Sequence, residues 1–348
     1  MACDRAGDEP TYPVDMARSH LTLAALATSA VTGLDLVEAA PFGSAGTGDF
    51  DSALLTGQDG RHWIVRVPRR ESAEAEQSAD LVALRALTAG VRSRLPFQVA
   101  TFAGQAPVDS TRAIVYEFVY GSKASVGALD LETAASIGQA IAAIHALPTS
   151  FVTEAGLPVQ SAQDSLRAST AVMDRAAATG LVPAALLQRW ELAADDAGLW
   201  QFQPTVINGS LAAGSFLLAS EKVTGVLGWH GLRVGDPARD LQWLIALRRE
   251  GLVDAAFDAY AAGRGTIDRR LRQRAMLLSE LEVARWLLHG TDTRSTEIVD
   301  DAVGMLSGLV DDVQNDMMSR ISAQTMPILA VDEVEDLLDR AEHAPGVA

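Results

Sequence analysis

The segment from residue 206 to residue 240 reads VINGSLAAGSFLLASEKVTGVLGWHGLRVGDPARD. Two apolar runs flank the polar triplet Ser220-Glu221-Lys222, a pattern that predicts a small β-hairpin. Asp236-Pro237 then resembles a helix N-cap followed by a proline at the first helical position. We therefore expect a hairpin and the start of a helix inside a part of the chain whose other periodic stretches are helical.

The chain before this segment has a different character. Residues 30–118 alternate short apolar runs with turn signals, and Asp59-Gly60 between two such runs is typical of a hairpin. One long stretch, 73–89, has helical spacing instead, and the Ala-rich stretch 21–29 is also expected to be helical. The expected strands cover residues 34–40, 52–56, 63–67, 99–102 and 113–118. These features predict an antiparallel sheet that carries one long helix.

The two patterns together predict an α+β, bilobal protein. We expect an N-lobe with an antiparallel sheet at residues 15–120 and a mainly helical C-lobe at residues 121–325, with the segment 206–240 embedded in it. Residues 1–14 are expected to form a disordered leader, and residues 326–348 an acidic tail. A strand-rich lobe followed by a helical lobe with an embedded hairpin is typical of kinases.

Composition narrows the classes of partner. The chain has 348 residues, with 28 Lys or Arg against 45 Asp or Glu, for a net charge of −17. Nucleic-acid phosphates and anionic membranes are repelled by so acidic a chain, so neither is an expected partner. A cationic small molecule, or a protein docking on the acidic C-lobe, suits this charge better. The single cysteine, Cys3, excludes an internal disulfide, and the lack of a signal-peptide pattern or membrane span predicts a cytoplasmic protein.

Five short segments, kept in order along the chain, resemble one known family. They read GRHWIVRVPRR at 60–70, RLPF at 94–97, AAIHALP at 142–148, VTGVLGW at 223–229 and RVGDPARD at 233–240. Together they are similar to the macrolide 2′-phosphotransferases, a branch of the aminoglycoside phosphotransferase family with a kinase-like fold. The resemblance implies transfer of the γ-phosphoryl group of ATP or GTP to a hydroxyl of a macrolide. It also implies Mg²⁺ held on carboxylates and a base beside the acceptor hydroxyl.

The chain departs from the family pattern at the positions that carry the chemistry. That pattern has a His-Gly-Asp-Leu loop, a metal-binding Asn or His five residues after the Asp, and an Ile-Asp-Trp element. Here Asn208 replaces the histidine, Ser210 the catalytic aspartate, Ser215 the metal-binding residue and Gly228 the principal Mg²⁺ carboxylate. A serine hydroxyl is not ionised near neutral pH, and loss of a general base costs ~10²–10⁴ in rate. We therefore expect no intact catalytic residue and no charged oxygen for Mg²⁺ at these positions.

The nucleotide-binding elements that the resemblance implies are better kept. Gly46 and Gly48 lie in a loop that would let the backbone approach phosphates, although an ordinary hairpin turn explains them as well. Arg66 takes the strand position that faces phosphate, and Asp80 stands where a glutamate would pair with it; that pair needs no nucleotide to persist. The hinge that meets a base edge through backbone groups corresponds to Glu117 and Phe118, which otherwise read as the end of a core strand.

Some intact side chains are candidates to replace the lost groups. Asp236 is the best surrogate carboxylate, although the Asp-Pro order favours a capping role. His230 is either a displaced base or a solvated loop histidine. Asp49 and Asp51 are either metal ligands or, as the sequence favours, solvated loop acids. His145, among alanines and isoleucines, is expected to be a packed structural residue.

Three functional hypotheses follow. The first is a pseudokinase, a member of the fold that has lost catalysis and acts as a ligand-binding or regulatory module. The second is an atypical active kinase, with relocated ligands, that transfers the nucleotide γ-phosphate to a hydroxyl of a macrolide-like or other small molecule. The third is sequestration of a cationic antibiotic without chemistry. The simultaneous changes at positions 210, 215 and 228 favour the first.

Overall fold

The first half of the protein is built on a five-stranded antiparallel sheet. The computed structural model describes residues 17–43, 48–265 and 268–314, so the expected leader and acidic tail lie outside the described residues. The strand order is β1-β2-β3-β6-β5, and every neighbouring pair is antiparallel, as expected. The strands are β1 (Leu36–Pro41), β2 (Phe50–Gly57), β3 (His62–Pro68), β5 (Phe102–Val108) and β6 (Thr111–Glu117).

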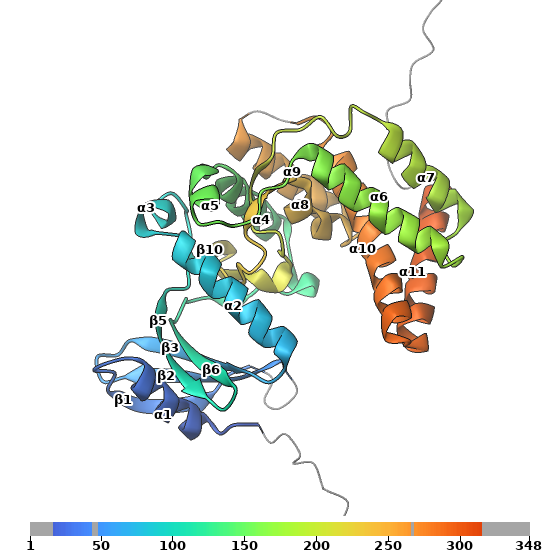
Figure 1. The fold of residues 1–348 in the computed structure, drawn as a ribbon. Coiled ribbons are helices and arrows are strands. Elements are labelled where there is room, and N and C mark those ends of the chain that lie inside the picture. Colours follow the sequence, from blue (N-terminus) through green and yellow to red (C-terminus); the bar gives the residue numbers. More distant parts are fainter. Residues whose placement is uncertain (1–16, 44–47, 266–267, 315–348) are drawn as a thin grey trace, which may run out of the picture.

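Side-chain alternation along β2 and β3 gives this sheet two faces. Ala53, Leu55 and Val65 are fully buried on one face, which α1 (His20–Ala30) covers with Leu23 and Ala27. α2 (Glu71–Ala86) crosses the opposite face, between the sheet and the rest of the molecule (Figure 1). The face that carries α2 therefore looks toward the second half of the chain.

The predicted hairpin is present, but its sheet is larger than expected. β9 (Phe216–Ala219) and β10 (Lys222–Val226) are flanked by β7 (Ser122–Lys123) and by β4 (Gln98–Val99), which runs parallel to β10. The single strand expected at 99–102 is therefore wrong: Gln98–Val99 belongs to the hairpin sheet, and the first sheet resumes only at Phe102. Arg92 explains the break, because its Nη1 donates to the carbonyls of Val99 and Ala100 at 3.0 and 3.1 Å and so occupies two acceptors of a continuous strand.

The remainder of the described chain is mainly helical, as predicted. α4 (Leu131–His145) packs closely on α9 (Glu250–Arg264), with Gly138 against the Ala256 carbonyl. An arm with its own apolar core extends on the right of Figure 1. It contains α6 (Ala162–Ala178), α7 (Ala184–Asp195), α10 (Leu271–Thr293) and α11 (Thr296–Gln314). The shorter helices are α3 (Ala89–Arg92), α5 (Ser150–Glu154) and the 3₁₀ turns η1 (Val126–Ala128) and η2 (Ala213–Ser215).

The segment 206–240 lies where the two halves meet. β8 (Thr205–Ile207) pairs antiparallel with β11 (Arg233–Gly235), and α8 (Ala238–Ile245) follows directly. This pairing places residues 205–207 and 233–235, which lie near the two ends of the segment, side by side. Within the described ranges, no helix combines the length and the apolar composition needed to cross a lipid bilayer.

Candidate functional site

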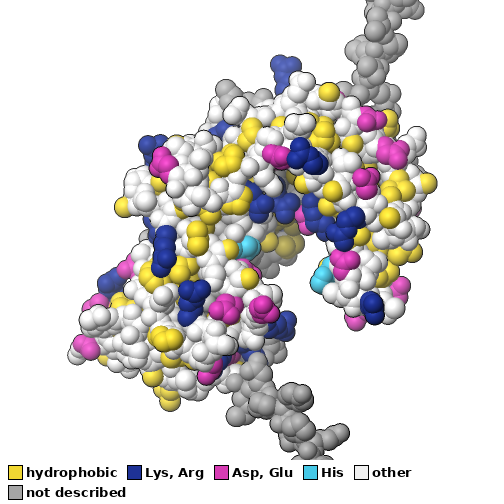
Figure 2. Space-filling model, viewed as in Figure 1, with side chains coloured by type: hydrophobic (Ala, Val, Ile, Leu, Met, Phe, Trp, Pro, Cys, Tyr) yellow, Lys and Arg dark blue, Asp and Glu magenta, His cyan; other side chains and the backbone are white. Residues whose placement is uncertain are grey.

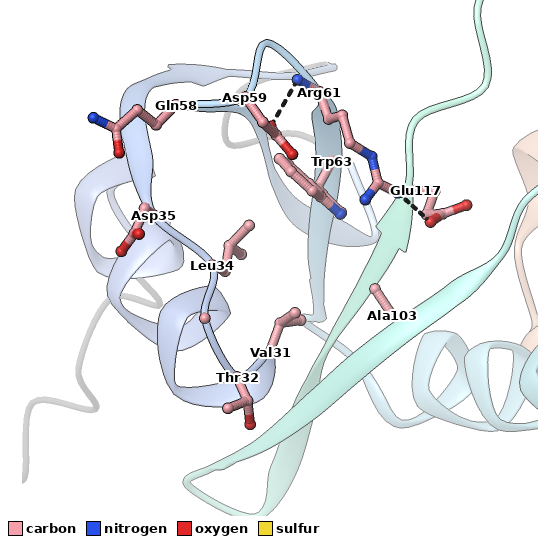
Figure 3. A pocket seen from close by; sticks show the side chains of 11 residues that line it. Val31, Thr32, Leu34, Asp35, Gln58, Asp59, Arg61, Trp63, Ala103 and Glu117 are labelled. Atoms are coloured by element: carbon pink, nitrogen blue, oxygen red, sulfur yellow. Dashed lines mark hydrogen bonds and ion pairs between the residues drawn. The ribbon is translucent and has the colours of Figure 1, made fainter.

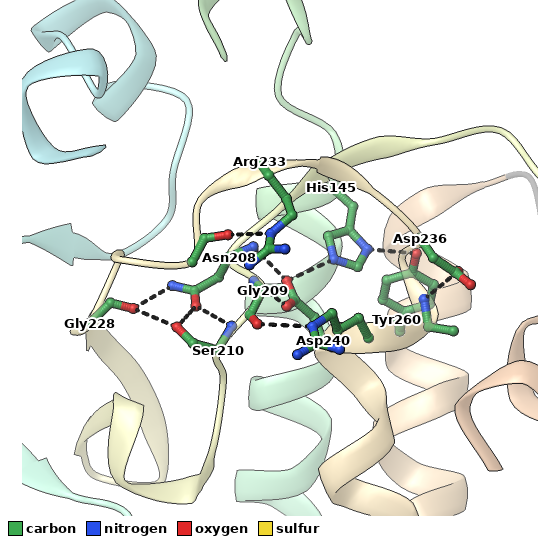
Figure 4. Close-up of polar contacts among 12 residues, drawn as sticks. His145, Asn208, Gly209, Ser210, Gly228, Arg233, Asp236, Asp240 and Tyr260 are labelled. Carbon is green, nitrogen blue, oxygen red and sulfur yellow. Dashed lines mark hydrogen bonds and ion pairs between the residues drawn. The ribbon is translucent and has the colours of Figure 1, made fainter. Parts of the chain in front are cut away.

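A buried carboxylate, Asp240, holds the loop at the head of this segment. Its Oδ2 accepts the backbone N–H of Asn208 and its Oδ1 that of Gly209, both at 2.7 Å. His145 Nε2 lies 3.2 Å from the same Oδ2, and its Nδ1 lies 2.9 Å from the Tyr260 hydroxyl (Figure 4). Asp240 and both His145 contacts are buried, which confirms the structural role predicted for His145. Asp240 thus fixes the backbone of this loop at Asn208 and Gly209.

This role of Asp240 depends on contacts between residues that are far apart in the sequence. Its partners in the loop lie 31 and 32 positions away, and His145 lies 95 positions away. No local pattern joins residues so distant, so this role emerges only in the folded chain.

Three of the replaced positions bond to one another above this brace. The Asn208 side-chain amide donates to the Gly228 carbonyl at 2.9 Å, and its Oδ1 accepts from Ser210 N at 3.1 Å and Ser210 Oγ at 3.0 Å (Figure 4). The amide orientation follows from these partners, because a backbone N–H can only donate and a carbonyl can only accept. The group Asn208, Ser210 and Gly228, which we call the neutral triad, is therefore internally satisfied and carries no charge.

The neighbouring position, Ser215, is also engaged locally. Its Oγ accepts the Ala212 N–H at 3.2 Å, which caps the single turn of η2, and its carbonyl accepts the Leu227 N–H at 2.8 Å. The hydroxyl thus bonds within its own turn, whereas the backbone carbonyl of Ser215 joins the two sides of the segment. Together with the neutral triad it offers no anionic oxygen.

Gly228 keeps a backbone shape that would accept a carboxylate. Its φ is +71°, and a Cβ built on it would meet nothing within 4 Å. Among non-glycine residues, Asn and Asp tolerate this left-handed region best. The position therefore has room for an aspartate side chain, although any residue other than glycine is strained at this φ.

The surrogate predicted at Asp236 is already occupied. Arg274, which is fully buried, donates from Nε to Asp236 Oδ2 at 2.9 Å and from Nη2 to Oδ1 at 3.1 Å. The predicted N-cap at Asp236 is wrong by one residue, because Pro237 takes the cap position instead of the first helical position; Asp236 Oδ1 still accepts the Ala238 N–H at 2.9 Å. Because both oxygens face a guanidinium, Asp236 is not available to a metal ion.

Asp51 corrects another expectation. It is not a solvated loop acid: it lies on β2, is buried, and forms ion pairs with Arg18 at 3.2 Å and Arg69 at 3.8 Å. Its burial follows from its place on the strand, which the sequence placed only from residue 52. Asp49, by contrast, is exposed and lies 3.2 Å from Arg70, in keeping with the expected loop acid.

Arg66, on β3, and Asp80, on α2, do not form the expected pair. The Arg66 guanidinium stacks 3.8 Å from the centre of the Phe50 ring, whereas Asp80 Oδ1 accepts the Trp229 N–H at 2.6 Å. No ion pair joins the two side chains among the contacts of the described residues, so the expected pair is wrong. Phe50 offers the cation an aromatic face, and the shorter aspartate reaches the backbone after Gly228 instead.

Asp80 is the one predicted residue whose carboxylate reaches the Gly228 position. Burial raises the pKa of Asp80 above its ordinary value, an effect that the Trp229 N–H and the charge of Arg66 oppose. His230 lies on the same side, half-exposed, with its Nδ1 3.6 Å from Glu76 Oε1. It therefore has a carboxylate partner, which neither of its predicted roles included.

The predicted hinge points its side chains away from the loop. Glu117 pairs with Arg61 at the rim of a cavity of about 610 Å³ on the outer side of the first sheet (Figure 3). Phe118 packs edge-on against Phe42 and Tyr120, and its N–H donates to the His62 carbonyl at 3.0 Å. Glu117 is the last residue of β6 and Phe118 follows it, and both side chains are partly exposed. Of the predicted phosphate loop, Gly48 is described, while Gly46 lies outside the described residues.

The donor set at the predicted metal positions does not fit a divalent cation. Mg²⁺ prefers hard, charged oxygens, and Ser215 and Gly228 supply none. Within the described part of the chain, no three His, Cys, Asp or Glu side chains are grouped so as to hold a metal ion. We therefore assign no reaction step to a bound metal.

Comparison with known proteins agrees with the fold. A model of the phosphotransferase enzyme family (APH) matches residues 44–277. The uncharacterized protein YcbJ of Bacillus subtilis is 23% identical over 255 residues, which cover 68% of this chain and 78% of YcbJ. A macrolide 2′-phosphotransferase from Brachybacterium faecium, solved as the apoenzyme, is 24% identical with a TM-score of 0.67, over 83% of this chain and 98% of that one.

Two further solved structures have the same architecture. Macrolide 2′-phosphotransferase type I is 27% identical with a TM-score of 0.65, over 82% of this chain and 96% of its own. The GDP and kanamycin complex of APH(2″)-IIia is 17% identical with a TM-score of 0.65, over 85% and 99% of the two chains. These similarities confirm the predicted α+β, bilobal, kinase-like fold. Since the family model spans most of both halves, this chain belongs to the phosphotransferase enzyme family.

Proposed function

We propose that this protein is a non-catalytic member of its family, a pseudokinase that binds a ligand in the cleft between its two halves without transferring phosphate. The observation that carries the proposal is the neutral triad. A phosphotransferase needs a base at the acceptor hydroxyl and anionic ligands for Mg²⁺. At Asn208, Ser210 and Gly228 this chain has hydrogen bonds that satisfy one another instead.

The occupied carboxylates support the same conclusion. Asp240 holds the loop backbone, Asp236 faces Arg274, and Asp51 faces Arg18 and Arg69. Freeing Asp240 would leave the two buried N–H groups of Asn208 and Gly209 without this acceptor, and freeing Asp236 would remove one of the two carboxylates that face the buried Arg274, each at a cost of several kcal/mol. An atypical active kinase, the second hypothesis, would therefore have to break these contacts before Asp236 or Asp51 could serve as a relocated ligand.

ATP or GTP is the ligand proposed for the side of the cleft below β2 and β3. One neighbour binds GDP, and this chain retains Gly48 and Arg66 at the corresponding elements. Arg66 would offer phosphate oxygens the planar N–H donors of its guanidinium once it leaves the Phe50 ring. We propose that such binding does not depend on Mg²⁺.

A phosphoryl-transfer assay with a repaired variant tests this proposal. The full chain is incubated with γ-³²P-labelled ATP or GTP, Mg²⁺ and a panel of macrolides and aminoglycosides. We expect no labelled product from the parent protein. Transfer that depends on Mg²⁺ at more than about one turnover per minute would overturn the proposal.

The repaired variant combines Asn208→His, Ser210→Asp, Ser215→Asn and Gly228→Asp. The histidine is included because an aspartate at 210 would otherwise face the Asn208 Oδ1 acceptor. We expect this variant to gain Mg²⁺-dependent nucleotide binding. A matched control with asparagine at 210, 215 and 228 has nearly the same shape but no added charge, and it should gain nothing.

Asp80 favours a second candidate function, an atypical active kinase. Its carboxylate lies 2.6 Å from the Trp229 N–H, beside the position where the family holds its Mg²⁺ carboxylate. In that case Asp80 would replace the lost aspartate from across the cleft. Asp80→Asn keeps the acceptor for Trp229 and removes the charge, so it should abolish any transfer that the parent shows; full activity in this variant would exclude the candidate.

A further inference from the structure

Two arginines enclose the loop at Gly209. Arg239, on α8, donates from Nε to the Gly209 carbonyl at 3.2 Å. Arg233, on β11, approaches from the other side: a Cβ built on Gly209 would lie 3.1 Å from its Nε, which donates to the Gly231 carbonyl at 2.8 Å. Figure 4 shows Arg233 reaching over the loop. Both arginine side chains therefore lie at Gly209, the residue that precedes Ser210.

These two arginines and Arg285 form an arginine cluster. The cluster has fewer carboxylate partners than guanidinium groups. Glu282 Oε1 is shared by Arg285 at 2.6 Å and Arg239 at 3.8 Å, and it also accepts from Gln242. Arg233 contacts no carboxylate among the described residues, and the two oxygens of Asp240 are already used beneath the loop. Burial, and then the charge of Arg239, lowers the pKa of Arg233.

The local charge thus has the opposite sign to the whole chain. Figure 2 shows Lys and Arg side chains gathered where the molecule is hollowed between α2 and the arm of α10 and α11. Guanidinium groups present several N–H donors in a fixed plane, a geometry that matches the oxygens of phosphate and carboxylate. Half-buried cations that repel one another are stabilised by an anion bound between them.

We propose that Arg233 and Arg239 bind the phosphate or carboxylate group of a small-molecule ligand at the acceptor side of the cleft. This inference deepens the proposed function, because it rests on the cleft serving for binding and names the chemistry of its ligand. It replaces the cationic ligand that the net charge of −17 favoured. Loss of an ionised aspartate at 210 fits it, since a carboxylate there would repel the same anion.

Isothermal titration of the full chain, without nucleotide, tests this site. The probes are inorganic phosphate and citrate, which distinguish the two sources of oxyanion, and kanamycin as a cationic probe, all at one ionic strength. We expect phosphate, citrate or both to bind and kanamycin not to bind. Arg233→Gln and Arg239→Gln should each weaken that binding about tenfold or more, the loss of a charge-assisted hydrogen bond.

Matched variants separate recognition from folding. Arg175→Gln removes an exposed arginine that pairs with Asp292 on the arm, and it should leave anion affinity unchanged. Arg233→Lys keeps the charge but loses the planar fork, so it should retain part of the affinity; a circular-dichroism spectrum identical to the parent's shows that each variant is folded. Equal affinity in parent and glutamine variants, no anion binding by the parent, or kanamycin binding that Arg233→Gln strengthens would overturn the inference. Because no nucleotide is present, these results are independent of whether the protein transfers phosphate.

Discussion

Substituting Asp236 with asparagine removes the charge that faces the buried Arg274 guanidinium. The pair is joined at 2.9 and 3.1 Å, and the arginine side chain has an exposed fraction of 0%. Breaking a buried ion pair by removing one partner costs about 3–5 kcal/mol, because the other charge stays behind uncompensated. Asp268, which also contacts Arg274 Nη2, remains in the variant and places the expected loss near the lower figure, about 3 kcal/mol.

Denaturant unfolding and calorimetry measure this loss. For a chain of this size, about 3 kcal/mol corresponds to a fall in Tm of roughly 5 °C. Asp49→Asn is the matched control, because that aspartate is exposed and its pair with Arg70 should contribute less than about 1 kcal/mol. The double variant Asp236→Leu with Arg274→Met removes both charges and should recover much of the stability.

A small effect would refute the reasoning. If Asp236→Asn unfolds within about 0.5 kcal/mol of the parent, the carboxylate is not committed to Arg274, and the magnitude taken for a buried pair does not hold here. Asp236 would then be free to act as a surrogate ligand. Catalysis with Asp236 as a relocated ligand would then be possible.

Three other changes test separate parts of the structure. Burial raises the pKa of Asp80, so the folded state holds the carboxyl proton more tightly than the unfolded state does. The contribution of Asp80 to the free energy of unfolding therefore falls as the pH rises from the ordinary pKa of an aspartate through the raised pKa. Asp80→Asn should flatten that fall, which urea unfolding measured across pH would show. Gly138→Ala would drive a methyl group into the Ala256 carbonyl, so we expect a loss of about 1–3 kcal/mol in the same assay, despite the better helix propensity of alanine. A double-mutant cycle on Phe50→Leu and Arg66→Met should give a coupling of about 0.5–1 kcal/mol, and zero coupling would contradict the stacked pair.

Local patterns predicted much of the fold. The Asp59-Gly60 turn lies between β2 and β3, with Gly60 at φ +77°, because glycine meets the needs of that turn without strain. Helix α2 lies where the apolar spacing of residues 73–89 predicts one, and α1 lies at the predicted helical stretch 21–29. These features depend on residues close together in the chain, which is why the sequence alone reveals them.

Contacts between distant residues were not predictable in the same way. β4 has two residues and pairs with β10 more than a hundred positions later, so no periodicity identifies it. The site behaves similarly: the replaced residues were recognisable by resemblance, but their bonding to one another depends on the left-handed turn at Gly209 and the shape at Gly228. The partner of Asp236 was invisible because Arg274 reaches it from α10.

Electron paramagnetic resonance of Mn²⁺, which substitutes for Mg²⁺, addresses the lack of anionic metal ligands most directly. The spectrum of Mn²⁺ without nucleotide, so that nucleotide binding cannot carry the ion to the protein, is recorded with and without an excess of the full chain, and then with the repaired variant. We predict that the parent protein leaves the spectrum of free Mn²⁺ unchanged and that the repaired variant adds a protein-bound signal. A bound signal with the parent, lost in Asp80→Asn, would contradict the account.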